Sequence, residues 1–131
     1  MSEAAVTEYL VLSRGQWDAS LPPEQIQGAI DRFYEWIGGH IEAGTMRPGQ
    51  RLATPGVTVY RGKVTDGPFG EAKEVIGGYW FIRAASLEEA ARMAGGNPVL
   101  ECGLFFELRP LELVRATAYD VTNETPGPRK G

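Results

Sequence analysis

The chain has 131 residues, 43% of them hydrophobic and 23% charged, which is the size and composition of one globular domain. Its 13 basic and 17 acidic residues leave a formal net charge of −4, so the chain lacks the positive field that binds nucleic-acid backbones. It has one cysteine, no basic start followed by an apolar stretch, and no run approaching about 20 apolar residues. We therefore expect a cytoplasmic protein with no disulfide, no secretory signal and no binding to nucleic acid or membrane.

The N-terminal third predicts a strand and then a long helix. Residues 1–7 are small and polar, and we expect a loose N-terminus there. The continuous apolar run 9–12 predicts a short strand covered on both faces. Pro22 and Pro23 suit the first turn of a helix, and Gly44 suits its end. Between them an apolar stripe recurs at helical spacing: Ile26, Ile30, Phe33, Ile37 and Ile41.

The middle of the chain predicts a strand or a hairpin, followed by a long strand. Segments 50–53 and 57–61, separated by a turn signal at 54–56, are expected to form the strand or hairpin. The long strand is expected over 74–84, where β-branched and aromatic residues dominate. The Gly77-Gly78 pair inside it indicates a bulge or a close backbone approach.

The C-terminal third predicts a second helix and a last strand. Ser86 suits the N-cap of that helix and Glu89 the capping-box position, while 95–98 ends it. The apolar run 102–108 predicts the last strand, closed by Pro110. We expect 114–131 to be a C-terminal extension with a disordered tail.

The order of these elements predicts the fold. A β-α-β-β-α-β order is typical of the ferredoxin-like α+β fold, in which both helices lie on one face of an antiparallel sheet. The strands are apolar on both faces, because Tyr79 and Phe81 alternate with Trp80 and Ile82. A monomer would expose one of these faces, so we expect a homodimer packed sheet to sheet as a dimeric α+β barrel.

Several motifs occur in a fixed order along the chain: V-T-D-G-P-F-G-E-A-K-E at 64–74, G-G-Y at 77–79, S-L-E-E-A at 86–90 and E-L-R-P-L at 107–111. Together they resemble the YCII-related family, specifically its DGPF branch, over residues 8–113. The resemblance implies a dimeric α+β barrel whose cleft holds an Asp and often a His, and it implies little about the substrate. The chain departs from the branch at Gly70, where Ala is more usual, and at Asn97-Pro98, where Cys-Pro often stands.

Asp66 and His40 are the candidate catalytic residues. A partly desolvated carboxylate on a Gly-Pro loop suits a general base, although Asp before Gly is also a common turn residue. The resemblance implies that Asp66 lies in the cleft. His40, the single histidine, lies at the edge of the apolar stripe and would shuttle protons with a nearby carboxylate. Its alternative role is a core-edge imidazole bonded to a backbone carbonyl, and the sequence leaves open whether it meets Asp66.

The candidate substrate-binding residues are Lys73, Tyr79, Glu107 and Arg109. Lys73 would position the loop or hold an anion, or belong to a solvated rim. Glu107 and Arg109 share one strand face, where they would form a partly buried ion pair, a carboxylate clamp or an inter-subunit salt bridge. Tyr79 would stack on a planar ligand or belong to the core. We expect no metal and no cofactor, because the sequence has neither metal-ligand spacing nor a phosphate-binding glycine motif.

Two functions fit these residues. The first is a cofactor-independent lyase or hydrolase that acts on a small molecule in the barrel cleft, with Asp66 as acid or base and His40 as its partner. The second is a non-catalytic ligand-binding or regulatory accessory protein, since DGPF proteins often resemble accessories of extracytoplasmic-function sigma factors. A pocket that contains both Asp66 and His40 would favour the enzyme, and exposed apolar surface beyond the dimer interface would favour the regulator.

Overall fold

The computed structural model describes residues 6–67 and 75–126. Lys73, the Pro68-Phe69 half of the D-G-P-F motif and both chain ends lie outside these residues. The elements follow in the order β1 (Thr7–Arg14), α1 (Pro23–Glu42), β2 (Met46–Arg47), β3 (Gly56–Tyr60), β4 (Lys63–Gly67), β5 (Ile76–Ala84), α2 (Leu87–Ala94), the 3₁₀ helix η2 (Pro98–Cys102) and β6 (Phe105–Pro110).

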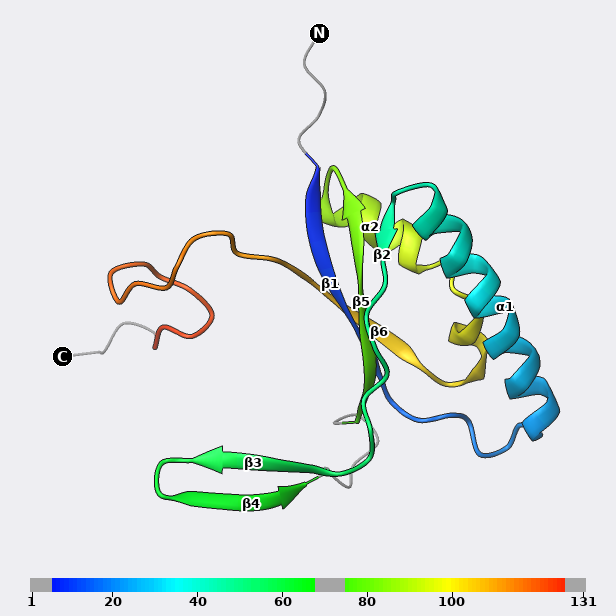
Figure 1. The fold of residues 1–131 in the computed structure, drawn as a ribbon, viewed down its shortest axis with the longest axis horizontal. Helices are drawn as coiled ribbons and strands as arrows, with labels where there is room; N and C mark the ends of the chain where they lie inside the picture. Colours follow the sequence, from blue (N-terminus) through cyan, green and yellow to red (C-terminus); the bar gives the residue numbers. More distant parts are fainter. Residues whose placement is uncertain (1–5, 68–74, 127–131) are drawn as a thin grey trace, which may run out of the picture.

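Four strands form one antiparallel sheet in the order β2-β5-β1-β6. Strand β5 lies between β1 and β2, so the β1-α1-β2 unit is split by a later strand, as the β-α-β-β-α-β order predicts. Both helices lie on the same side of the sheet (Figure 1). The predicted α+β architecture is therefore confirmed.

The predicted hairpin was wrong in its position along the chain. Its strands are β3 and β4, and the turn between them is Arg61-Gly62, where Gly62 has a φ of +72° that glycine adopts without strain. Segment 50–53 makes no hairpin strand and instead runs beside the start of β5. Asp66, expected in an irregular loop, lies on β4 opposite Val57.

The last strand begins later than predicted. Pro98–Cys102 form η2, and the Asn97 side chain caps it by accepting a hydrogen bond from the Val99 N–H at 3.0 Å. Strand β6 therefore starts at Phe105 rather than at Cys102. Proline at the first helical position favours this turn over an earlier strand.

The core lies between the sheet and the helices. Its main cluster consists of Tyr9, Val11, Ile37, Met46, Trp80, Ile82, Ala84, Ala90 and Ala94. The N-cap of α2 is as predicted, since the Ser86 hydroxyl oxygen accepts from the Glu89 N–H at 3.1 Å. In the apolar stripe of α1, Ile37 is buried, whereas the other four members are half-buried. The stripe is incompletely covered because part of it faces a cavity.

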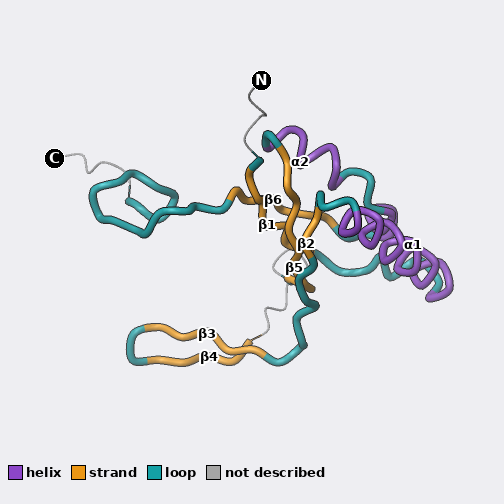
Figure 2. The backbone as a smooth tube through the Cα atoms, turned by 45° about the horizontal axis from the view of Figure 1, so that its top comes forward, coloured by secondary structure: helices purple, strands orange, loops and turns teal. Residues whose placement is uncertain are grey.

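The opposite face of the sheet carries no helix. Leu10, Leu12 and Phe81 lie half-buried on it. At one end Arg47 donates to both Glu8 carboxylate oxygens at 2.8 and 2.9 Å, which holds the pKa of Glu8 below its ordinary value. The β3–β4 hairpin and the C-terminal extension project away from the helices on this side (Figures 1 and 2).

Candidate functional site

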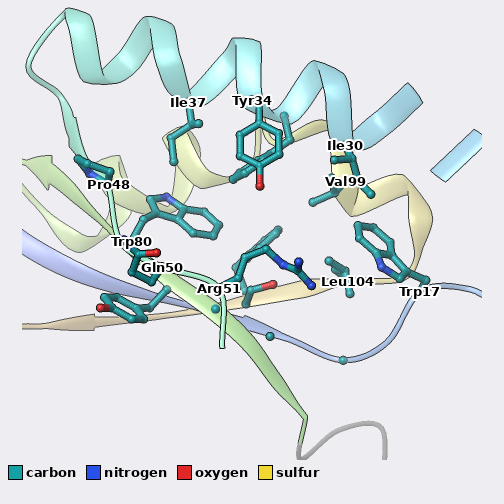
Figure 3. A pocket seen from close by; sticks show the side chains of 18 of the residues that line it. Trp17, Ile30, Tyr34, Ile37, Pro48, Gln50, Arg51, Trp80, Val99 and Leu104 are labelled. Atoms are coloured by element: carbon teal, nitrogen blue, oxygen red, sulfur yellow. The ribbon is translucent and has the colours of Figure 1, made fainter. Parts of the chain in front are cut away.

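A cavity of about 1040 Å³ lies between α1 and the sheet. Its walls come from α1, the end of β1 and the chain just after it, segment 48–51 that follows β2, the start of β5, η2, and the chain from 104 into β6 (Figure 3). Four residues of the apolar stripe of α1 line this cavity, where a ligand could contact them: Ile30, Phe33, Ile37 and Ile41.

Aromatic rings form the apolar part of the cavity. Phe33 on α1 and Phe106 on β6 both pack edge-on against Trp80, with ring centroids 5.5 and 5.2 Å away. Ile30 and Ile37 extend the wall along α1 (Figure 3). Apolar, largely aromatic walls of this kind suit an aromatic organic ligand.

Arg51 and Tyr34 bring polar groups to the cavity from opposite walls. Figure 3 shows the Tyr34 hydroxyl pointing down from α1 and the Arg51 side chain extending into the space beneath it. Among the described residues, Arg51 has no carboxylate partner, in contrast to Arg47 and Arg109. Its guanidinium is therefore available to a ligand.

Backbone pairing with β5 fixes the position of Arg51. The Tyr79 N–H donates to the Gln50 carbonyl at 3.0 Å, the Leu52 N–H donates to the Gly77 carbonyl at 2.8 Å, and Arg51 lies opposite Gly78. A Cβ on Gly78 would be 2.9 Å from the Gln50 carbonyl oxygen, so the close approach requires glycine here. Residues two apart on a strand share a face, so Arg51 lies on the same side of the sheet as Trp80.

The indole N–H of Trp80 is closed to solvent, so it is not part of the cavity surface. Trp80 is 5% exposed, and its Nε1 has no hydrogen-bond partner among the described residues. A buried donor without a partner costs roughly 1–3 kcal/mol.

The structure does not bring the two predicted catalytic residues together within one copy. His40 lies on α1, where its Nδ1 is 2.9 Å from the Thr45 hydroxyl and its ring packs edge-on against Trp36 at 5.1 Å. Asp66 is exposed at the root of the hairpin, which projects away from α1 (Figure 1). The described cavity walls contain neither residue.

The side chains of the other predicted binding residues that the structure describes lie on the helix-free face of the sheet. Tyr79 lines the cavity with part of its structure, and its ring packs edge-on against Phe81 at 5.9 Å. Glu107 and Arg109 form an ion pair at 3.3 Å on the helix-free face, where Glu107 also pairs with Arg14. Tyr79 is thus the predicted binding residue, among those described, that reaches the cavity.

Arg51 and Tyr34 are the functional candidates that sequence reasoning missed. Gly49 and Gly78 carried a usable signal for Arg51, since glycines on both sides allow two backbones to approach closely. Tyr34 stands four residues after Ile30 and therefore on the same side of α1. Elsewhere in the described part of the chain, no group of three or more His, Cys, Asp or Glu residues is arranged to hold a metal ion. Of the helices described, none is both long and apolar enough to cross a membrane.

The model of the YCII-related domain matches residues 8–113. The chain belongs to the YCII-related family. The matched region contains the cavity and every residue assigned to it above, so the pocket is a feature of this YCII-related domain.

Comparison with curated proteins gave no match. Among solved structures, the YCII-related domain is similar to 5-chloro-2-hydroxyhydroquinone dehydrochlorinase (TftG) from Burkholderia phenoliruptrix AC1100, in its complex with 2,5-dihydroxybenzoquinone. The sequence identity is 13%, the match covers 80% of this chain and 93% of that chain, and the TM-score is 0.43.

Proposed function

We propose that this YCII-related domain binds a small planar organic molecule in the cavity between α1 and the sheet. The cavity itself carries the proposal: about 1040 Å³ walled by aromatic and aliphatic side chains, with a small number of polar groups directed inward. Ligand pockets occupy roughly 300–1,000 Å³ and have this composition. Because the described walls hold neither a carboxylate nor an imidazole, ligand binding is the function that the geometry supports best.

A cofactor-independent lyase or hydrolase reaction is the second candidate, with Asp66 as the acid or base. The exposure of Asp66 supports it, since its carboxylate lies on β4, inside the matched YCII-related region, and is open to solvent. His40 is the weaker partner for this chemistry because its Nδ1 already faces the Thr45 hydroxyl.

A regulatory role, such as binding a sigma factor, has a different supporting observation. Val57, Val59 and Val64 of the hairpin are 62%, 72% and 61% exposed. Val59 and Val64 lie directly opposite each other, and Val57 is two residues from Val59, so the three share one face. Exposed apolar surface of this kind marks interaction sites.

We also propose that two copies associate through the helix-free faces of their sheets. The half-buried Leu10, Leu12 and Phe81 support this arrangement, because an apolar sheet face requires a covering layer. The hairpin and the C-terminal extension project on the same side and would reach around a second copy (Figure 1).

The test of ligand binding is calorimetric titration of the protein with 2-naphthoate and with its neutral analogue 2-naphthamide. We expect at least one to bind at millimolar concentration or below. Ile30→Trp should weaken binding by roughly 10-fold or more, equivalent to about 1.4 kcal/mol, because the larger side chain fills the cavity.

Glu35→Trp is the matched control, since it adds the same ring at an exposed position of α1. It should bind as the unmodified protein does, and melting curves should show that both variants fold. Binding that Ile30→Trp leaves intact would place the ligand elsewhere, and failure of both compounds to bind would contradict the proposed function.

A further inference from the structure

We infer that the ligand is a planar aromatic carboxylate, bound with its carboxylate at Arg51 and its ring beside Trp80. This inference rests on the proposed function and adds the chemical class of the ligand. It follows from the charge of the cavity, from the direction of its donors and from the placement of its aromatic rings.

The charge of the cavity selects an anion. Arg51 is the one charged side chain among the described lining residues, so the described walls offer one positive charge and no negative charge. A guanidinium presents parallel N–H donors that match the two oxygens of a carboxylate. A cationic ligand would be repelled by Arg51, and a neutral one would gain nothing from its charge.

A second polar group lies across the cavity from Arg51. The Tyr34 hydroxyl enters from the opposite wall (Figure 3) and can donate to an oxygen of the ligand. Arg51 and Tyr34 therefore suit a ligand that carries oxygens, of which the carboxylate takes the charged donor.

The aromatic rings place the remainder of the ligand. Phe33 and Phe106 pack against Trp80, and together they make one continuous aromatic wall on the same side of the sheet as Arg51. A flat ring along this wall would have its carboxylate directed to the Arg51 side of the cavity. One guanidinium neutralises a carboxylate, whereas a phosphate dianion would keep one uncompensated charge beside the apolar wall, which favours the carboxylate.

Solvent limits the affinity that a ligand gains from pairing its carboxylate with Arg51. Arg51 is exposed in the absence of ligand, so its pairing with an anion is partly screened by water and salt. We therefore expect a preference of about 10-fold for the carboxylate over the neutral amide, the scale of one charge-assisted contact at a wet site.

The experiment is calorimetric titration with 2-naphthoate, 2-naphthamide and 2-naphthyl phosphate. It compares the unmodified protein with Arg51→Gln and with Arg61→Gln, which removes the same charge from the exposed hairpin turn. We expect 2-naphthoate to bind best, about 10-fold better than the amide. Arg51→Gln should abolish that preference without weakening amide binding, and Arg61→Gln should leave it unchanged.

Three results would overturn the inference. Equal affinity for carboxylate and amide, with both weakened by Ile30→Trp, would refute the carboxylate while leaving the proposed function in place. A preference that persists in Arg51→Gln, or tightest binding of the phosphate, would show that the anion site was assigned wrongly. If none of the compounds binds, both the inference and the proposed function fail.

Discussion

Asp66 and His40 are two ionisable side chains that differ in burial and in hydrogen bonding. His40 is half-buried near the end of α1 and is engaged by Thr45, whose hydroxyl also donates to the His40 carbonyl at 3.1 Å. Asp66 is exposed on a strand that projects from the sheet. The helical spacing placed His40 at the edge of the apolar stripe, but only the packing reveals its partner.

Asp66→Asn tests whether Asp66 acts as an acid or base. The amide keeps the size of the carboxylate, and exposed substitutions usually change stability by less than about 0.5 kcal/mol, so the melting temperature should hardly move. If Asp66 performs proton transfer, turnover of a ligand found by titration should be lost while its affinity stays within about twofold. Chromatography of the incubated ligand measures turnover. A rate unchanged from that of the unmodified protein would exclude Asp66 from the chemistry.

His40→Gln is the companion variant. We expect it to leave ligand affinity unchanged, because His40 is absent from the described cavity walls. It should lower the free energy of unfolding by about 1 kcal/mol through the lost contact with Thr45. A loss of turnover equal to that of Asp66→Asn would instead show that the two residues share a site, which would require contact between different copies or a rearrangement.

At the scale of elements, the segment that follows β2 is the part of the fold most dependent on β5. It enters no hairpin, and its place is set by backbone hydrogen bonds to Gly77 and Tyr79. The Gly77-Gly78 pair predicts a bulge or a close approach, and the structure has both. Pairing of β1 with β5 skips Gly77, and Gly78 lies against Gln50 and Arg51.

The two glycines provide a matched pair of variants. A Cβ on Gly78 would crowd the Gln50 carbonyl oxygen at 2.9 Å, whereas a Cβ on Gly77 meets no atom within 4 Å. Gly78→Ala should therefore cost roughly 1–3 kcal/mol, as other overpacking substitutions do, and should weaken 2-naphthoate binding by displacing Arg51. Gly77→Ala should be nearly neutral in both respects. Urea unfolding and calorimetry measure the two effects, and equal losses would contradict the assigned packing.

The stability of the β3–β4 hairpin is not accounted for by contacts within one copy. A two-stranded hairpin alone is marginally stable in water, and this one exposes Val57, Val59 and Val64. Its turn at Gly62 is a local signal in the sequence, yet the earlier Pro55-Gly56 pair competed with it as a turn signal. Local turn chemistry could not decide between them, because strand pairing selects the register.

For the whole molecule, a homodimer is the expected assembly. The protein at micromolar concentration should sediment with about twice the chain mass of 14.3 kDa. Leu12→Glu should dissociate it, because the charge falls in the middle of the helix-free face, where Leu12 lies opposite Tyr79 and Glu107. Leu87→Glu, at a 47% exposed position on α2, should remain dimeric. A stable, folded monomer of the unmodified protein would refute the dimer.

The sequence by itself determined the two helices and the presence of strands β1, β5 and β6, whereas the short edge strand β2 was not predicted. The two prolines at the start of α1, its apolar stripe and the Ser86 cap of α2 act through residues within a few positions of each other, so they can be read without the fold. The tertiary structure decided where the hairpin forms, that Asp66 and His40 lie apart, and that Arg51 enters the cavity. Each of these depends on contacts between distant parts of the chain, such as Arg51 against Gly78, and no local pattern specifies which distant residues will meet.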